Sequence, residues 1–343
     1  MREKEKTSRE KLRERKPKVL SKILAHEHEM IPRIQLQADY QCNMKCSHCS
    51  ISGIKDKDRH QLTLDEIHNL FVEADKIGIS RMTLSGGEPL TFPNLDEMIL
   101  AIDPSKFWIQ IDTNGLLLSK EKLVHLRELG VDCIAPSLDT IDFDNENFGH
   151  GNKAAQNILD HLDFIKECDF SIFMQTVVTK SRLYSQEFIN YLKYFTEKKI
   201  GTFVTFAKPV GSFAGHYDEC ITHKDLEYFE TLEKEYMTFT HLTPGYGLNE
   251  ERKCVAGKNI FAVTAYGDCL PCIYWYCSFG NILEESFEII YNRMRNTNIF
   301  DHDTCLLADI SNSFIKNYVD PLYKDDKKLP ISYKEILGAK HFN

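Results

Sequence analysis

The sequence lacks the features that would place the chain in or across a membrane. No uninterrupted apolar run approaches the roughly 18 residues that a membrane-spanning helix needs. The N-terminus is charged from its second residue and has no apolar segment of the kind found in secretory signal peptides. Positive charge is not in excess either, because the formal net charge is −9, which argues against broad binding to nucleic acids. We therefore expect a cytoplasmic protein with no membrane or nucleic-acid partner.

The sequence also lacks the even spread of cysteines that a disulfide framework would show. The number of cysteines is odd, at 11, and most of them fall into two groups. Together with the missing export signal, this pattern favours thiolate ligands in a reducing cytoplasm. The isolated Cys133 and Cys168 are expected to be buried apolar residues. A length of 343 residues allows a large core and more than one folded unit.

Strands and helices are predicted to alternate from residue 34 to residue 206. The period of the apolar residues defines the segments, helped by start and stop signals such as the capping box at Thr63 to Glu66 and the stop at Gly78. The expected strands cover residues 34–38, 81–85, 107–113, 133–137, 170–178 and 202–206, and the expected helices cover 63–77, 95–102, 119–129, 152–168 and 186–199. Such alternation is typical of parallel strands joined by right-handed crossovers. We therefore expect an α/β fold, a partial (β/α)6 TIM-type barrel.

Polar residues gather where these strands end. They are Asp39, Ser85 to Glu88, Asp112 to Gly115, Ser137 to Thr140, Thr176 to Lys180, and Lys208 with Pro209. In barrel enzymes the C-terminal ends of the strands form the active-site face. The loop after the first strand and the turn after the second strand should therefore meet at one mouth.

The loop after the first strand holds three cysteines within eight residues. Cys42, Cys46 and Cys49 are spaced C-x3-C-x2-C, and no fourth cysteine follows closely. Three thiolates can ligate three irons of a [4Fe–4S] cluster, which leaves the fourth iron open to another ligand. The alternative is a zinc site, which prefers four Cys or His ligands and could use His48 as the fourth.

These cysteines and Gly86-Gly87-Glu88-Pro89 after the second strand together resemble the radical SAM superfamily, over about residues 34–210. The resemblance implies that the three cysteines hold a [4Fe–4S] cluster whose open iron binds S-adenosylmethionine (SAM). It also implies that Gly86 and Gly87 let the backbone approach the methionine moiety. Glu88 would accept a charge-assisted hydrogen bond from the SAM ammonium. Further SAM contacts are implied for residues at the next two strand ends, namely Thr113, Asn114, Ser137 and Asp139.

A second group of cysteines lies between residues 254 and 305. Residues 260–264 and 269–272 flank a Gly-Asp turn and predict a β-hairpin, and residues 286–294 predict a helix. The hairpin, its cysteines and the following Gly-Asn-Ile resemble the SPASM or Twitch extension of radical SAM enzymes, which holds auxiliary iron–sulfur clusters. The resemblance implies one auxiliary cluster, of the [4Fe–4S] type. Its ligands would be Cys254, Cys272 and Cys305, with either Cys269 or Cys277 as the fourth, or an iron left open for substrate. The alternative is a zinc knuckle that stabilises the hairpin.

This interpretation divides the chain into four regions: a charged N-terminal arm (1–30), the radical SAM barrel (31–212), a linker with the Twitch-like domain (213–318) and a peripheral tail (319–343). The alternating charges of the arm predict a solvated segment. Cys220 is a candidate donor of a hydrogen atom to a substrate radical. His150, His216 and His241 have no partner at metal-ligand spacing, so we interpret them as ordinary loop histidines. The aromatic run at 274–276 is interpreted as packing around a cluster.

The resemblance predicts reductive cleavage of SAM to a 5′-deoxyadenosyl radical, which abstracts a hydrogen atom from the substrate. Enzymes with this extension commonly modify peptides or proteins, so a peptide-modifying maturase is the favoured function. The alternatives are a dehydrogenase of a small alcohol or sugar, and a non-catalytic iron–sulfur scaffold or redox sensor. An external one-electron donor of the flavodoxin or ferredoxin type is implied.

Overall fold

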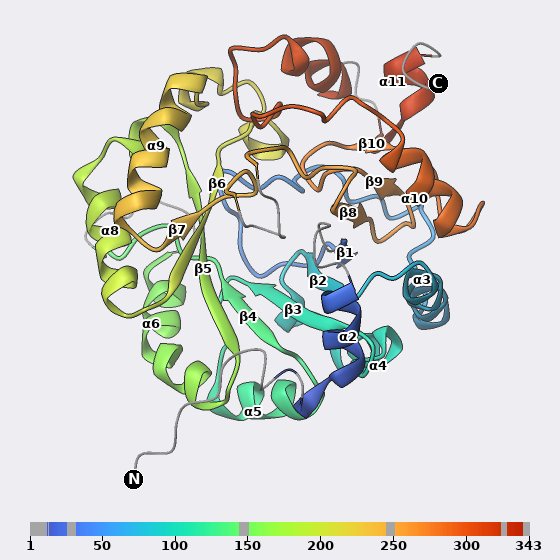
Figure 1. Ribbon diagram of the computed structural model, residues 1–343, viewed down its shortest axis with the longest axis horizontal. Helices are drawn as coiled ribbons and strands as arrows, with labels where there is room; N and C mark the ends of the chain where they lie inside the picture. Colours follow the sequence, from blue (N-terminus) through green and yellow to red (C-terminus); the bar gives the residue numbers. More distant parts are fainter. Residues whose placement is uncertain are drawn as a thin grey trace.

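One curved sheet forms the centre of the molecule in the computed structural model, which describes residues 12, 14–25, 32–143, 151–244, 251–323 and 328–338. The sheet has nine strands in the order β7-β6-β5-β4-β3-β2-β1-β8-β9. Neighbouring strands run parallel except β8 and β9, which form an antiparallel pair. Figure 1 shows the helices arranged around the outside of this sheet. The edge strands β7 and β9 do not pair with each other, so the barrel is open, as predicted.

The strands of the central sheet are β1 (Arg33–Asp39), β2 (Arg81–Gly86), β3 (Trp108–Thr113), β4 (Cys133–Pro136), β5 (Ser171–Val178), β6 (Gly201–Phe206), β7 (Thr238–Phe239), β8 (Ile260–Val263) and β9 (Cys269–Leu270). Two short strands, β10 (Cys277–Ser278) and β11 (Ile331–Ser332), form a separate parallel pair. The α-helices are α2 (Pro17–Ala25), α3 (Leu64–Lys76), α4 (Leu95–Ile102), α5 (Lys120–Glu128), α6 (Gly151–Glu167), α7 (Lys180–Leu183), α8 (Gln186–Glu197), α9 (His223–Glu235), α10 (Phe287–Arg295) and α11 (Tyr333–Leu337).

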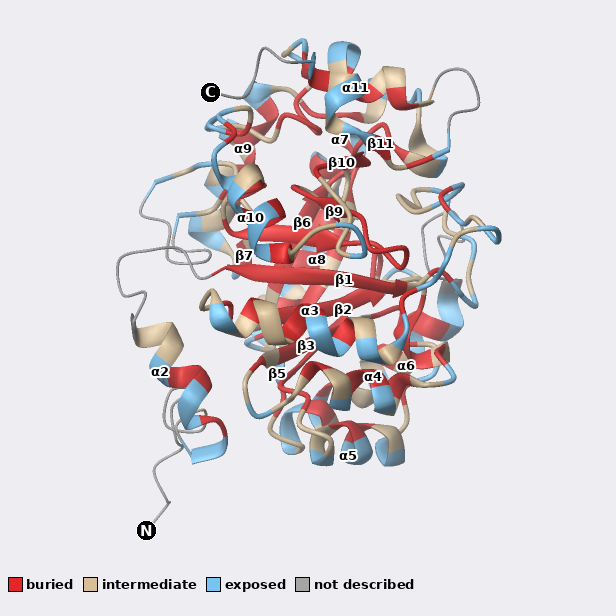
Figure 2. Ribbon diagram, turned by 90° about the vertical axis from the view of Figure 1, so that its right-hand side faces the viewer, coloured by how far each residue is buried: buried red, intermediate tan, exposed pale blue. Residues whose placement is uncertain are grey.

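The helices begin where the sequence places their capping residues. Thr63 and Glu66 form the predicted reciprocal capping box at the start of α3, and Gly78 adopts a φ of 85° just beyond its end. Ser119 and Ser185 cap α5 and α8 with their side-chain oxygens. Figure 2 shows the strands buried, whereas the helices carry buried residues on one side and exposed residues on the other. This division is what an α/β fold requires, because helices cover the sheet with their apolar faces.

The predicted hairpin of the C-terminal region continues the barrel sheet. Residues 260–263 of β8 pair in parallel register with residues 33–36 of β1, and β9 returns antiparallel to β8. On the opposite edge, β7 extends the sheet beyond β6, although the sequence predicts a linker in this region. The region from 213 onward therefore contributes strands to both edges of the barrel sheet.

The prediction of a solvated N-terminal arm is wrong for three residues between 16 and 20. Lys16, Val19 and Leu20 are buried. The Lys16 ammonium donates to the carbonyls of Phe107 and Gly130 and contacts the buried Asp132 carboxylate. Phe107 precedes β3, and Gly130 and Asp132 precede β4, so the segment around Lys16 covers the N-terminal ends of these two strands.

The prediction of a peripheral C-terminal tail is also wrong for the described part of residues 319–343. Ile331 and Leu337 are buried, and β11 pairs with β10 of the cysteine-rich region. Tyr323 accepts a hydrogen bond from the Gly211 amide at 3.1 Å, which ties the tail to the loop after β6. Among the described residues, no helix has both the length and the apolar character needed to cross a membrane.

Candidate SAM and iron–sulfur sites

The three cysteines of the first group line a hollow at the C-terminal ends of the barrel strands. The hollow has a volume of about 700 Å³ and is lined by Cys42, Cys46 and Cys49 together with residues that follow β2, β3 and β4. Burial raises the pKa of the Cys42 and Cys49 thiols above the ordinary value. A metal must therefore displace protons to bind these sulfurs as thiolates. The cysteine loop and the Gly-Gly-Glu turn meet at one mouth, as the sequence predicts.

Gly86 and Gly87 are needed where β2 packs against the segment that leads into the cysteine loop. A Cβ atom on Gly86 would collide with the Asp39 carbonyl, and one on Gly87 would collide with the Gln41 carbonyl. Gly86 also has a φ of 112°, which favours glycine. The Gly87 amide donates to the Asp39 carbonyl at 2.8 Å. Both glycines line the hollow, and their lack of a side chain lets this backbone approach the cysteine segment.

Glu88 connects the ends of β2 and β3 through its buried carboxylate. It accepts hydrogen bonds from the Leu90 amide at 3.0 Å, the Thr113 hydroxyl at 2.7 Å and the Asn114 amide at 2.7 Å. The Asn114 side chain in turn donates to Asn43, between the first two cysteines, at 2.7 Å. The carboxylate lies in the lining of the hollow, where it can meet a ligand ammonium. Glu88 thus also orients Thr113 and Asn114, a role that the sequence pattern did not predict.

Ser137 lines the hollow, but Asp139 does not. Asp139 is buried and accepts hydrogen bonds from the Val177 amide at 2.9 Å and the Thr176 hydroxyl at 3.2 Å. Its other oxygen lies 3.5 Å from Nε2 of His48, which sits in the cysteine loop. The contact of Asp139 with SAM stays a prediction, and in this structure Asp139 contacts His48 of the cysteine loop instead of lining the hollow.

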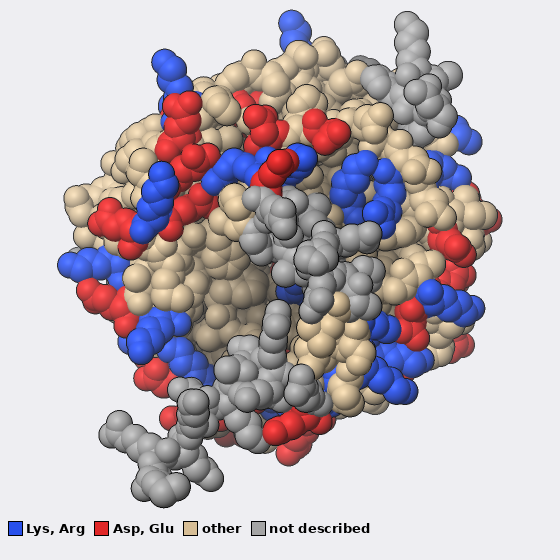
Figure 3. Space-filling model, in the orientation of Figure 1, with Lys and Arg blue, Asp and Glu red and all other residues tan. Residues whose placement is uncertain are grey.

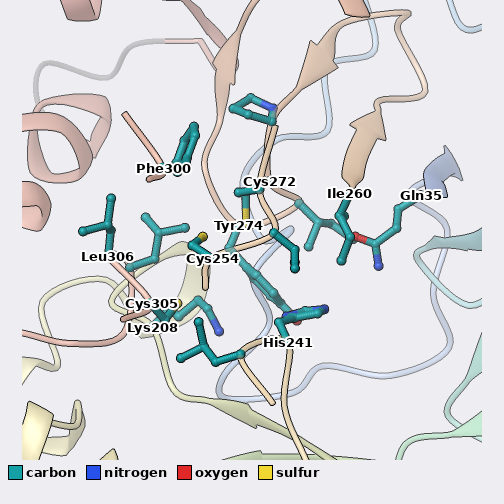
Figure 4. A pocket seen from close by; sticks show the side chains of 16 residues that line it. Gln35, Lys208, His241, Cys254, Ile260, Cys272, Tyr274, Phe300, Cys305 and Leu306 are labelled. Atoms are coloured by element: carbon teal, nitrogen blue, oxygen red, sulfur yellow. The ribbon is translucent and has the colours of Figure 1, made fainter. Parts of the chain in front are cut away.

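A second hollow brings together Cys254, Cys272 and Cys305, the three predicted auxiliary ligands. Figure 4 shows their side chains extending toward a shared space, with those of Lys208, Tyr274 and His241 around it. Burial raises the pKa of the Cys272 thiol to about 11 and that of Cys254 still further. His241 is not an ordinary loop histidine, because it lines this hollow, where burial lowers its pKa to about 3.

The other predicted cysteines lie outside both hollows. Cys269 is fully buried in β9 with its thiol near the Gly267 carbonyl, and Cys277 is fully buried in β10. The structure thus corrects the expectation that one of them faces the auxiliary ligands. Cys220 is also fully buried, and its thiol donates to the His216 carbonyl. It lines neither hollow, so the role of hydrogen-atom donor loses its geometric basis.

The two hollows share a wall. Ile273 and Tyr274 line both of them, whereas the next two residues of the aromatic run, Trp275 and Tyr276, are fully buried. In the aromatic run 274–276, Tyr274 therefore lies at the sites, and the other two residues lie in the core. The residues that pattern reasoning missed at the sites are Gln35, Gln37, Gln175 and Ser212. The position of Gln37 in a strand that leads to the cysteine loop is the one signal that the sequence offered.

The donor sets suit iron–sulfur clusters better than the zinc alternatives. Among the described residues, no three His, Cys, Asp or Glu side chains converge closely enough to hold a single metal ion. A four-coordinate zinc site would need such convergence. A cluster instead spreads its cysteine ligands over separate irons. Three thiols line each hollow, and Glu88 adds a carboxylate at the first, where it fits the ammonium of SAM.

Known proteins share both halves of this arrangement. Residues 40–186 match the Radical SAM superfamily, and residues 254–310 match SPASM, an iron–sulfur cluster-binding domain. An AdoMet-dependent heme synthase of Methanosarcina barkeri is 26% identical over 280 residues, which are 73% of this chain and 79% of the relative. A GTP 3′,8-cyclase of Staphylococcus carnosus is 30% identical over 216 residues, 59% of this chain and 62% of the relative.

Solved structures with a similar fold include two enzymes that bind SAM. Streptococcus suis SuiB bound to S-adenosylmethionine has a TM-score of 0.60 at 18% identity and covers 90% of this chain and 78% of its own. Native anSMEcpe with bound AdoMet has a TM-score of 0.57 at 15% identity and covers 83% of this chain and 87% of its own. The two matched domains imply a [4Fe–4S] cluster that binds SAM, SAM itself, and the binding of auxiliary iron–sulfur clusters. Residues 40–186 of the chain thus have the sequence of the Radical SAM superfamily, and residues 254–310 form a C-terminal SPASM domain.

Proposed function

We propose that this chain is a peptide- or protein-modifying enzyme that abstracts a hydrogen atom from its substrate. When bound at the first hollow, the reduced cluster and SAM supply the 5′-deoxyadenosyl radical for this step. Cys42, Cys46 and Cys49 hold the cluster and leave one iron for SAM. Glu88 accepts a charge-assisted hydrogen bond from the SAM ammonium. The electron comes from a donor of the flavodoxin or ferredoxin type.

The observation that carries this proposal is the pair of cysteine-lined hollows that meet at Ile273 and Tyr274. A substrate held in the first hollow lies next to the wall of the second. Cys254, Cys272 and Cys305 would hold the auxiliary cluster there, ready to accept an electron from the substrate radical. The peptide substrate is supported by the fold shared with SuiB, which has been solved with its precursor peptide SuiA at a TM-score of 0.60 and 18% identity. Figure 3 shows positive and negative side chains interspersed over the face drawn there.

The test is an anaerobic assay of the reconstituted, reduced protein. We expect SAM to be cleaved to 5′-deoxyadenosine by the wild type and not by the Cys42/Cys46/Cys49→Ala variant, with iron content as the control for loading. Candidate peptides encoded beside the gene are then added in deuterated form. Transfer of deuterium from a peptide into 5′-deoxyadenosine supports the proposal. Absence of 5′-deoxyadenosine with every reductant would favour the scaffold or sensor alternative.

The alternative of a small-molecule substrate rests on the curated relatives. The names of the heme synthase and the GTP 3′,8-cyclase point to small molecules, and these relatives align over 280 and 216 residues. A dehydrogenase of a small alcohol or sugar belongs to the same class. Transfer of deuterium from a labelled metabolite, with none from any candidate peptide, would replace the peptide proposal with this one.

A further inference from the structure

A buried lysine lines the hollow of the three auxiliary cysteines. Lys208 follows β6, and only 8% of the residue is exposed. Its ammonium donates to the Phe206 carbonyl at 2.9 Å and lies 4.2 Å from the centre of the Tyr274 ring. These two contacts hold the positive charge at the wall of the hollow, where Figure 4 places Lys208 among the cysteines.

The described surroundings of this ammonium supply no negative side chain to compensate it. The lining of the hollow contains no aspartate or glutamate, and no carboxylate of the described residues forms an ion pair with Lys208. A buried charge is costly unless an opposite charge lies nearby. The groups of the hollow that become negative are the thiols of Cys254, Cys272 and Cys305, which bind iron as thiolates.

We propose that Lys208 is the fixed positive charge of the auxiliary-cluster site and raises the reduction potential of that cluster. An electron added to the cluster makes the site more negative, and a nearby buried ammonium stabilises the added charge. The inference rests on the auxiliary cluster of the proposed function and is independent of the substrate.

This charge favours the direction of electron flow that oxidation of a substrate radical needs. Tyr274, which lies under the ammonium, lines the SAM hollow as well. An electron that passes from a substrate radical in the first hollow to a cluster in the second would add one negative charge beside Lys208. Lys208 therefore stabilises the reduced cluster next to the wall that the electron must cross.

The experiment is a redox titration followed by electron paramagnetic resonance, without SAM or substrate. The holoprotein is compared with a Cys42/Cys46/Cys49→Ala background, in which the auxiliary signal stands alone. Lys208→Met is expected to lower the equilibrium constant for one-electron reduction by roughly tenfold or more, which is about 59 mV per tenfold step. Lys208→Arg keeps the charge and should stay near the wild type, and the exposed Lys224→Met on α9 is the matched control.

An unchanged potential in Lys208→Met, or an equal shift in Lys208→Arg, would overturn the inference. If Lys208→Met loses the auxiliary cluster, iron and sulfide analysis decides: retention in Lys208→Arg and loss in Lys208→Gln supports the charge, whereas loss in all three variants contradicts it. Failure of the proposed function is distinguishable, because it would remove 5′-deoxyadenosine formation without moving this potential.

Discussion

At the scale of single residues, a carboxyl in the SAM hollow couples the stability of the fold to pH. Asp112 is the next-to-last residue of β3 and accepts a hydrogen bond from the Gln110 side chain at 2.6 Å. Burial is the main cause that raises its pKa from 3.8 to about 6, and the negative charge of Glu88 adds to the rise. The folded protein therefore holds a proton on Asp112 over a pH range in which the unfolded chain has released it.

The direction in which pH changes the stability follows from this difference in bound protons. Between about pH 4 and pH 6 the folded state binds more protons than the unfolded state, so the free energy of unfolding falls as pH rises. A shift of about two units limits the loss to about 3 kcal/mol. Water in the hollow reduces this limit, and we expect about 1–2 kcal/mol. Asp112 therefore adds its full contribution to the free energy of unfolding below about pH 4 and none above about pH 6.

Asp112→Asn should therefore stabilise the protein at pH 8 by about 1–2 kcal/mol, and by clearly less at pH 5. Urea unfolding at the two pH values measures the difference. The exposed Asp218→Asn is the control and should change stability equally at both. A gain by Asp112→Asn that is the same at pH 5 and pH 8 would contradict the assigned cause.

The sequence predicted which residues gather at the SAM hollow but not what they contact there. The spacing of Cys42, Cys46 and Cys49 and the turn at Glu88 carry enough chemistry to name the cofactor. The partners of Glu88 lie on other strands, and no local pattern encodes them. His241 and Lys208 meet the auxiliary cysteines only because β6 and the segment after β7 run side by side. A lone histidine or lysine gives no signal of such a meeting.

At the scale of elements, the helix that precedes the barrel is anchored by one buried ion pair. Lys16 lies just before α2, and its ammonium is shared between the Asp132 carboxylate and two carbonyls. Asp132 also accepts from the Ile109 amide at 2.9 Å and lies 3.5 Å from Arg15. Burial is the largest influence on the pKa of Lys16 and lowers it, against the opposing pull of Asp132. Removing the lysine would leave a buried carboxylate without its main partner.

Lys16→Met should lower the free energy of unfolding by about 3 kcal/mol, because breaking one side of a buried pair leaves the other charge uncompensated. Chemical denaturation of the loaded protein measures this loss. Lys18→Met, on the exposed side of the same segment, should change stability by less than about 0.5 kcal/mol. The double variant Lys16→Met/Asp132→Asn should recover part of the loss. Equal effects of Lys16→Met and Lys18→Met would show that the arm is not anchored in this way.

Long elements with clear capping residues could be predicted from the sequence, whereas very short elements could not. Helices such as α3 and α8 have Thr or Ser caps and a long apolar period, and their observed bounds lie within two residues of the prediction. The strands β7, β10 and β11 have two residues each, which is too short for an alternating pattern to be detected. The burial of Lys16 was missed for a related reason: alternating charge predicts a solvated segment, and one lysine does not break that pattern.

At the scale of the whole molecule, the SAM barrel and the auxiliary region share one sheet. β8 pairs with β1, the strand that leads into the cysteine loop. The Arg33 amide donates to the Asn259 carbonyl at 2.6 Å just before the paired residues. Periodicity predicted the hairpin of β8 and β9 but could not assign its neighbour, because pairing between distant strands depends on the packing of the whole chain. The shared sheet fixes the two cysteine-lined hollows relative to each other.

This arrangement predicts two independent clusters in one protein. The reconstituted wild type should bind roughly eight irons and eight sulfides, as two [4Fe–4S] clusters do. The Cys42/Cys46/Cys49→Ala variant and the Cys254/Cys272/Cys305→Ala variant should each keep about half. Iron and sulfide analysis with Mössbauer spectroscopy measures both the number and the type of clusters.

The cysteines outside the hollows make this prediction sharper. Cys269 and Cys277 are fully buried away from the auxiliary ligands, so Cys269→Ala and Cys277→Ala should each retain both clusters. Loss of half the iron from either variant would mean that this cysteine is the fourth ligand after all, and that the strand carrying it turns toward the hollow when iron binds. If both variants keep the full content, the auxiliary cluster takes its fourth ligand from a group other than cysteine. The iron content thus tests whether the geometry of the shared sheet, in which β9 directs Cys269 into the core, also governs the loaded protein.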